Sequence, residues 1–359
     1  MLYFGIIQSM NRELTMAAEN RRSPQQGNLT RLTVLLSLLV SCVALPACSR
    51  KDQKPVGPPE KVTIAYATLI EASLAHVAQA EGYNREENLA VTARLHPYGK
   101  LALKDVLEGK ADFATVAETP VMFAILNGEK IAIIASIYSS QKNHAIIARK
   151  DLGILVPQDL RERKIATTLG ITSDFFMDGF LAVHGIARKE LTVVNLKPEE
   201  LENAIVSGEV AAVSSFYPYL SLTQKKLGDK GITFYDPDIY TETFNVVATQ
   251  EFIRKNPETV RKMLRALVKA EEMARKNPEE AQKLVAQFTG IAPDIVAETW
   301  GIGSFELTLN QLLILVLEDE AQWAIENDFT LARKMPNYLD YIYFDGLKSI
   351  KPEVVRILQ

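Results

Sequence analysis

The sequence predicts an α/β fold divided into two lobes, and three observations support this. From residue 61 onward, short runs of β-branched and aliphatic residues alternate with amphipathic helical segments, as in an α/β fold with a largely parallel sheet. The alternation occurs twice in a chain of 359 residues, which is long enough for two cores. Residues 107–114 (LEGKADFA) also resemble residues 206–213 (VSGEVAAV), since each has a helix end, a glycine, a charge and a buried strand.

The N-terminal segment has the features of an export signal. Four arginines precede an apolar stretch at residues 32–47, which is short for a membrane span and ends in the sequence LPAC at residues 45–48. This ending resembles the bacterial lipobox, which predicts a lipoprotein signal peptide at residues 1–47 and lipidation of Cys48. A plain signal peptide with an incidental cysteine is the alternative. Residues 48–60 are polar and proline-containing, as expected for a tether.

Composition excludes several other classes of protein. The chain has two cysteines, and removal of Cys42 with the signal would leave Cys48 without an internal disulfide partner. The formal net charge of −4 gives no reason to expect nucleic-acid binding. The four histidines are far apart in the sequence, and we expect no metal site and no cofactor.

The first series of elements belongs to the predicted first lobe. Residues 131–138 are apolar enough for a strand that is buried on both faces. Gly82 is placed to end the first helix, and Thr119 can cap a helix whose first residue is Pro120. The predicted strands are residues 62–66, 90–95, 112–116 and 131–138, and the helices between them are residues 73–81, 99–109 and 120–127.

A second series follows after a strand that leaves the first lobe. Its strands are predicted at residues 144–149, 164–168, 192–195 and 210–214, with helices at residues 173–184, 198–207 and 218–227. Residues 244–249 form a return strand, and the Asn-Pro pairs at residues 256–257 and 277–278 mark later helix starts. We therefore assign residues 61–143 and 244–359 to lobe I, and residues 144–243, with crossover strands, to lobe II.

Candidate binding residues follow the carboxyl ends of the predicted strands, where parallel sheets place their ligands. They are Thr68, Leu69, Tyr98, Glu118, Thr119, Tyr138, Thr168, Gly170, Ser173, Phe216 and Tyr217.

Several of these residues have two interpretations. Free N–H groups at residues 170–173 can hold an anion, although Ser173 can equally be a helix cap and Asp174 would compete for the same dipole. Glu118 can accept hydrogen bonds from an amine or a heterocyclic N–H, or it is a solvated loop acid. The aromatic candidates either stack on a ring or fill the core. Because these loops contain no Arg or Lys, they favour a nitrogen-bearing ring over a simple anion.

Four motifs carry a resemblance to a known family. They are residues 75–83 (AHVAQAEGY), residues 107–114, residues 164–173 (KIATTLGITS), and residues 208–213 (GEVAAV) followed by FYPY at residues 216–219. Ala211 stands where an aspartate is common in the family. In order and spacing the chain resembles the periplasmic solute-binding proteins for nitrate, sulfonates, taurine and thiamine precursors over most of residues 61–255.

The resemblance implies a two-lobed periplasmic binding protein fold of type II, with a ligand cleft between the lobes. It also implies a monomeric, non-enzymatic protein on the periplasmic or cell-surface side of a membrane, which delivers a small solute to an ABC permease and its ATPase. Enzymes of the chorismate dehydratase and thiamine-pyrimidine synthase types are the alternative on the same fold. Both work inside cells, and the cysteine-rich motif of the second is absent, so the export signal argues against them.

Overall fold

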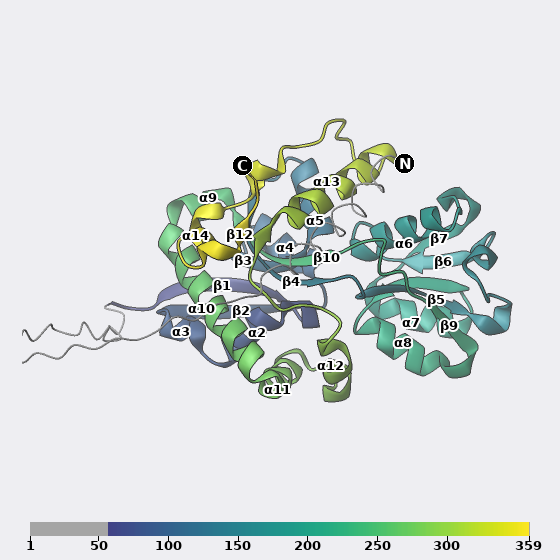
Figure 1. Ribbon diagram of the computed structural model, residues 1–359, viewed down its shortest axis with the longest axis horizontal. Helices are drawn as coiled ribbons and strands as arrows, with labels where there is room; N and C mark the ends of the chain where they lie inside the picture. The colour runs from purple at the N-terminus through teal and green to yellow at the C-terminus, as the bar shows by residue number, and fades with distance from the viewer. Residues whose placement is uncertain (1–56, 359) are drawn as a thin grey trace, which may run out of the picture. The chain divides into compact units, whose positions relative to one another are not determined.

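The computed structural model describes residues 57–358, which contain two five-stranded mixed sheets (Figure 1). Cys42, Cys48 and the predicted signal peptide therefore lie outside the described residues. The first sheet has the order β2-β1-β3-β10-β4 and the second has the order β7-β6-β8-β5-β9. The α/β, two-lobed prediction is confirmed.

The first sheet is parallel on one side and antiparallel on the other. β1 pairs in parallel with β2 and β3, and β10 runs antiparallel between β3 and β4. Its strands are β1 (Glu60–Ala67), β2 (Leu89–His96), β3 (Phe113–Ala117), β4 (Ile131–Ser140) and β10 (Glu242–Thr249), and its early helices are η1 (Ile70–Ala72), α2 (Ser73–Ala80), α3 (Tyr83–Glu86), α4 (Gly99–Leu107) and α5 (Glu118–Leu126).

The second sheet repeats the plan, because β5 runs antiparallel to β8 and β9 while β6, β7 and β8 are parallel. Its strands are β5 (His144–Arg149), β6 (Lys164–Thr167), β7 (Thr192–Asn195), β8 (Ala212–Phe216) and β9 (Gly231–Phe234), and its helices are α6 (Thr172–Val183), α7 (Pro198–Ser207) and α8 (Tyr219–Leu227). Short 3-10 turns occur at η2 (Lys150–Leu152), η3 (Pro157–Leu160), η4 (Arg188–Glu190) and η5 (Gly228–Lys230).

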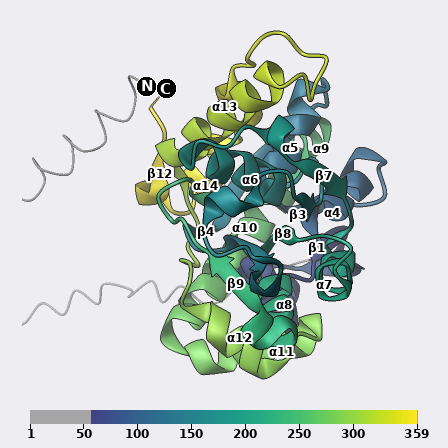
Figure 2. The same cartoon turned by 90° about the vertical axis from the view of Figure 1, so that its right-hand side faces the viewer.

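The C-terminal part is mainly helical, as predicted. It contains α9 (Gln250–Lys255), α10 (Pro257–Lys276), α11 (Pro278–Thr289), α12 (Pro293–Trp300), β11 (Leu309–Asn310), α13 (Gln311–Glu326), η6 (Tyr338–Tyr341), α14 (Phe344–Lys348), η7 (Pro352–Val354) and β12 (Val355–Arg356). Both Asn-Pro pairs start helices, since Pro257 and Pro278 are the first residues of α10 and α11. In Figures 1 and 2, α13 lies beside α5.

The period-two pattern of β5 determines how the second sheet is covered. Ile146 and Ala148 pack in the core that contains Phe176 of α6, whereas Ala145 and Ile147 pack in the core that contains α7 and α8 residues. Successive side chains of a strand point to opposite faces, so an apolar strand of this kind needs helices on both sides. Figure 1 shows α6 on one face of this sheet and α7 and α8 on the other.

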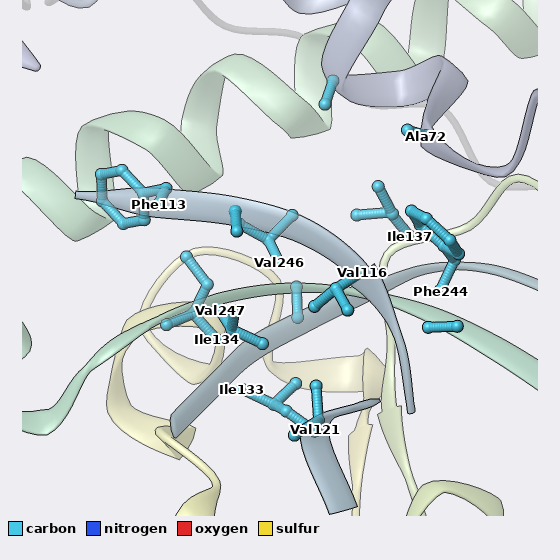
Figure 3. Close-up of a cluster of buried hydrophobic side chains, with 14 of the residues drawn as sticks. Ala72, Phe113, Val116, Val121, Ile133, Ile134, Ile137, Phe244, Val246 and Val247 are labelled. Atoms are coloured by element: carbon cyan, nitrogen blue, oxygen red, sulfur yellow. The ribbon is translucent and has the colours of Figure 1, made fainter. Parts of the chain in front are cut away.

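The centre of the first sheet is apolar on both faces. Its strands contribute Phe113 and Val116 of β3, Ile133, Ile134 and Ile137 of β4, and Phe244, Val246 and Val247 of β10, which cluster in Figure 3. All of these side chains are buried. Strands β3, β4 and β10 therefore form a rigid platform from which the adjoining loops project.

The boundaries differ from the predicted ones at two places. Glu60 already belongs to β1, because its backbone pairs in register with Leu89 and its side chain bonds to Lys262 and Thr259. The predicted tether is therefore too long by one residue. The return strand begins at Glu242 rather than at residue 244, because Glu242 and Thr243 pair with Ser140 and Ser139 of the first sheet.

The chain passes between the sheets at residues 141–143 and again at residues 235–241.

No helix among residues 57–358 has the length and apolar character that a membrane span requires.

Gly99 allows α4 to start against β3. A Cβ at Gly99 would lie 2.7 Å from Cα of Val116, which is a backbone atom that cannot move aside cheaply. We expect Gly99→Ala to lower the free energy of unfolding by about 1–3 kcal/mol in urea titrations. Gly301→Ala is the matched control, because its Cβ would meet nothing within 4 Å and should leave stability unchanged. Equal stability of the two variants would contradict the close-packing argument.

Candidate functional site

The loops that follow the parallel strands of both sheets meet between the lobes. Nζ of Lys100, in the first turn of α4, donates to the carbonyl oxygen of Leu169 at 3.0 Å. The hydroxyl oxygens of Thr119, in the first turn of α5, and of Thr172, the first residue of α6, lie 3.3 Å apart. The N-terminal ends of α4, α5 and α6 therefore converge at one interlobe cleft, as expected for the carboxyl ends of parallel strands.

The cleft contains two connected spaces. A small inner cavity of about 30 Å³ lies between Leu69, Glu71 and Glu242 on one side and His144, Thr172 and Phe216 on the other. A larger outer space of about 890 Å³ shares Tyr98, Lys100 and Pro120 with it. The inner cavity has room for about one or two waters, so a solute can enter it only when the lobes separate.

The structure brings five of the predicted site residues to these spaces. Leu69, Tyr98 and Phe216 line the inner cavity, and Tyr98, Thr168 and Gly170 line the outer one. The ring of Phe216 lies 5.8 Å from that of His144 and 5.4 Å, edge-on, from that of Tyr219. Phe216 and Tyr98 therefore provide the aromatic surfaces that the sequence predicted at the cleft.

Other predicted residues have structural partners and line neither space. The hydroxyl of Thr68 donates to the carbonyl of His96 at 3.1 Å. Tyr138 is buried against Phe305, at 5.1 Å between ring centroids. The hydroxyl of Tyr217 meets that of Tyr235 at 3.3 Å.

Ser173 and Thr119 also have internal partners. Ser173 is the second residue of α6 rather than its cap, and its hydroxyl bonds to that of Thr167 at 3.1 Å. Thr119 is the second residue of α5, which begins at Glu118, so the predicted cap at Thr119 is wrong. Its hydroxyl donates to Glu320 of α13, a residue that sequence reasoning did not single out.

Glu118 is fully buried and lies outside the lining of the inner cavity. Its Oε2 accepts from the backbone N–H of Thr243 at 2.8 Å and from the hydroxyl of the same residue at 3.0 Å. Burial raises the pKa of Glu118 to about 8, although these hydrogen bonds oppose the shift. Glu118 is therefore not a solvated loop acid. Its Oε2 already accepts two hydrogen bonds from Thr243.

A second pair of acids lies directly at the inner cavity. Nδ2 of Asn143 donates to Glu71 at 2.7 Å and to Glu242 at 2.6 Å, so a single amide bridges two buried carboxyl groups. Burial raises the pKa of Glu71 to about 7. Burial, followed by the charge of Glu71, raises the pKa of Glu242 well above its ordinary value. Ionising both carboxyl groups would cost free energy, because the two charges would be buried close together and away from water.

Glu320 completes a set of four buried acids. Burial, followed by the charge of Glu118, raises its pKa well above the ordinary value. Among the described residues, Oε2 of Glu71 has no hydrogen-bond partner, whereas Glu118 and Glu320 can share a hydrogen bond when one of them is protonated. Buried oxygens of this kind are uncommon, because an unmade hydrogen bond costs about 1–3 kcal/mol.

His144 does not neutralise these acids. Its imidazole is buried among Phe176, Phe216 and Tyr240, and burial lowers its pKa to about 3. Its Nδ1 lies 3.8 Å from Glu242, and its Nε2 has no partner among the described residues. The imidazole is therefore neutral near pH 7 and adds another unpaired polar atom to the cavity lining.

The loop at residues 170–173 is partly occupied by the protein's own acid. Gly170 has φ of +70°, which favours glycine, and its N–H donates to Asp174 at 3.0 Å. Asp174 also bonds to Arg188 at 2.9 Å. Asp174 therefore already accepts from an N–H group that an anionic ligand would need.

The predicted binding residues include no Arg or Lys, but the cleft itself contains both. Lys100 lines both spaces and Arg188 lines the outer one. Sequence reasoning missed them because Lys100 follows the turn residue Tyr98, and Arg188 belongs to η4, remote in sequence from the loops. Arg188 is already paired with Asp174 and Asp178, and burial lowers the pKa of Lys100.

Glu71 and Glu242 were also missed, although each had a sequence signal. Glu71 follows the predicted site residue Leu69 by two positions, and Glu242 precedes the predicted return strand. No group of three or more His, Cys, Asp or Glu side chains with metal-binding geometry occurs in residues 57–358.

Two lobes with helix starts converging on an interlobe cleft define the class of periplasmic solute-binding folds. The chain belongs to the NMT1/THI5 like family, whose family model matches residues 72–281. A structure of the aliphatic sulphonate binding protein SsuA from Escherichia coli covers 79% of this chain and 98% of its own, with a TM-score of 0.68 and 19% identity. The predicted fold and family are confirmed.

Two proteins with similar sequences are named for binding sulfonates or taurine. A candidate aliphatic sulfonates-binding protein of Bacillus subtilis is 28% identical over 162 residues, which cover 45% of this chain and 48% of the relative. The taurine-binding periplasmic protein of Escherichia coli is 23% identical over 215 residues, which cover 58% of this chain and 65% of the relative. The chain thus spans about half the length of the first relative that it matches.

The buried acids make the stability of the free protein depend on pH. The folded state raises the pKa of Glu71 from 4.5 to about 7 and so holds its proton more tightly than the unfolded chain does. The stabilisation of the folded state by this bound proton is complete below about pH 4.5 and is lost as the pH rises through about 7. The free energy of unfolding of the wild-type protein should therefore fall by on the order of 3 kcal/mol between these pH limits. Thermal or urea unfolding of Glu71→Gln should lack this fall.

The exposed Glu209, on the turn before β8, supplies the matched control. Glu209→Gln should keep the pH dependence of the wild-type protein, whereas an unchanged dependence in Glu71→Gln would show that Glu71 does not titrate as a buried acid.

Proposed function

We propose that this protein is the lipid-anchored, extracytoplasmic solute-binding subunit of an ABC importer. It binds a small organic solute between its lobes and delivers it, as a monomer without a cofactor, to a permease and its ATPase. Membership of the NMT1/THI5 like family and the names of the relatives as sulfonate- and taurine-binding proteins support a binding role rather than an enzymatic one. Lipidation of Cys48 would hold the protein at the periplasmic or cell surface.

We further propose that the solute is a nitrogen-bearing ring compound, such as a thiamine-precursor-like pyrimidine, rather than nitrate or a simple alkylsulfonate. The inner cavity carries this proposal, because its lining contains Glu71, Glu242 and neutral His144, which are hydrogen-bond acceptors. Phe216 and Tyr98 offer surfaces for a ring. The N–H of Gly170, which could have held an oxyanion, is bonded to Asp174.

The remaining predicted residues have supporting roles in this proposal. Thr168 and Gly170 shape the outer space, and Leu69 contributes apolar surface to the inner one. Glu118, Thr119 and Ser173 act indirectly, through Thr243, Glu320 and Thr167, in holding the cleft helices in place.

The solute can be identified by native mass spectrometry of protein purified from its own host. Calorimetry with the retained compound should then give a Kd that rises about tenfold or more in Phe216→Ala, because stacked surface is lost in the inner cavity. Tyr235→Phe, at an exposed ring outside both spaces, should bind as the wild type does. Tight binding of an alkylsulfonate, unaffected by Phe216→Ala, would count against the ring-compound proposal.

The anchor has a separate test in the native host. Wild-type protein should fractionate with membranes, because each buried CH₂ of an acyl chain contributes about 0.8 kcal/mol. Cys48→Ser should release the protein or block its processing. Cys42→Ser changes a residue that would be removed with the signal and should leave the protein in the membrane fraction. A soluble, unlipidated wild-type protein would disprove the anchor.

A further inference from the structure

The Asn143 amide, between Glu71 and Glu242, has no capacity left for further acceptors. Its Nδ2 carries two hydrogens, and one is directed to each carboxyl group, at 2.7 Å and 2.6 Å. Oε2 of Glu71 is left without a donor, although the side chain is about 1% exposed. Nε2 of His144, which lines the same cavity, also lacks a partner among the described residues.

These unpaired atoms point to what the cavity would bind. A carboxylate oxygen accepts hydrogen bonds, and a neutral imidazole has one ring nitrogen that accepts and one that donates. Because they line a cavity rather than packed core, a solute that carries N–H donors can satisfy them, whereas a sulfonate or nitrate would place more acceptors against acceptors.

Several of the titratable groups around the cluster carry no charge near pH 7. The titratable groups around Glu71 and Glu242 come from α4, α5, β4, β5, α8 and α13, and they are Lys100, Glu118, Tyr138, His144, Tyr219 and Glu320. Burial keeps Tyr138 and Tyr219 protonated and His144 deprotonated, so none of the three carries a charge near pH 7. Lys100 directs its ammonium at the carbonyl of Leu169.

We propose that the inner cavity takes a planar monocation with at least two N–H donors, of the amidinium or aminopyrimidinium kind, and that this cation replaces a proton on the Glu71–Asn143–Glu242 cluster. The inference rests on the solute-binding function proposed above and specifies the charge state of the solute and its linkage to pH.

The exchange conserves the charge of the cavity. In the free protein the cluster retains a proton, because two carboxylates bridged by one neutral amide repel each other. When the lobes open, the O–H bond of that carboxylic acid breaks and the proton passes to solvent. The carboxylate then accepts the N–H groups of the incoming cation, as a charge-assisted pair. One positive charge leaves and one enters, and no oxidant or other reactant is needed.

Three probes with the same phenyl ring and different charge test this proposal with the complete mature protein. They are benzamidinium, which is a permanent cation at neutral pH, neutral benzamide, and anionic benzenesulfonate. Calorimetry in two buffers with different ionisation enthalpies counts the protons released. Benzamidinium should bind with release of about one proton. Its Kd should therefore fall about tenfold for each unit that the pH rises, over the range in which the cluster holds that proton. Benzamide should bind more weakly and without proton release.

Matched variants assign the proton to the cluster. Glu71→Gln should abolish proton release and weaken benzamidinium binding at least about tenfold, since the amide cannot ionise. Glu242→Gln provides a second variant if the first does not fold, with the same expected result. Glu209→Gln, at the exposed turn, should keep both affinity and proton release.

The outcomes separate this inference from the proposed function. Tighter binding of benzenesulfonate than of benzamidinium, no benzamidinium binding at millimolar concentration, or proton release that persists in both cluster variants would each overturn the inference. The solute retained from the host should behave as benzamidinium does. If it binds and depends on Phe216 but releases no proton, the exchange is wrong while the solute-binding function stands. If no solute is retained and Phe216→Ala has no effect on any ligand, the proposed function fails as well.

Discussion

The cleft depends on the position of Asn143 between two carboxyl groups. Asn143 ends the first connection between the sheets, and Glu242, at the start of β10, ends the second. Glu71, in η1 after β1, is the third member. One amide therefore ties both chain crossings to the loop after the first strand. Because the crossings are short, any separation of the lobes must take place around this point, and the hydrogen bonds of Asn143 limit how the strands β5 and β10 can be oriented.

The helix N-termini at the cleft differ from those of an anion-binding site, because acidic side chains of the protein lie beside them. None of α4, α5 and α6 has a side-chain hydrogen bond from its N-cap residue. Helix N-termini of this kind favour negative groups. Here the protein supplies those groups itself, with Glu118 in the first turn of α5 and Asp174 in the first turn of α6. In this chain Asp174 already accepts the N–H of Gly170, where an oxyanion could have been held.

The sequence predicted the fold better than the site, for a physical reason. Strand and helix positions follow from local periodicity and capping, so the starts of α10 and α11 and the apolar strand β4 could be read from neighbouring residues. Loop positions followed from the same pattern, which placed Leu69, Tyr98 and Phe216 at the cleft. The partners of those loops depend on contacts between distant segments. Glu320 reaches Thr119 from α13, and Trp323 of the same helix donates to Asp178 of α6 at 2.8 Å; no local pattern indicates either contact.

Lobe closure and protonation are coupled by the same desolvation. An acid in an open cleft faces water and titrates near its ordinary pKa, so it has little need of a counter-charge. Closure removes that water, and the carboxyl groups of Glu71 and Glu242 must then either keep a proton or receive a cation. A ligand can shift a conformational equilibrium only through its different affinity for the two states. A cationic solute has that difference, because its attraction to the carboxylate grows as water is removed, whereas with a neutral solute the closed acids simply keep their proton.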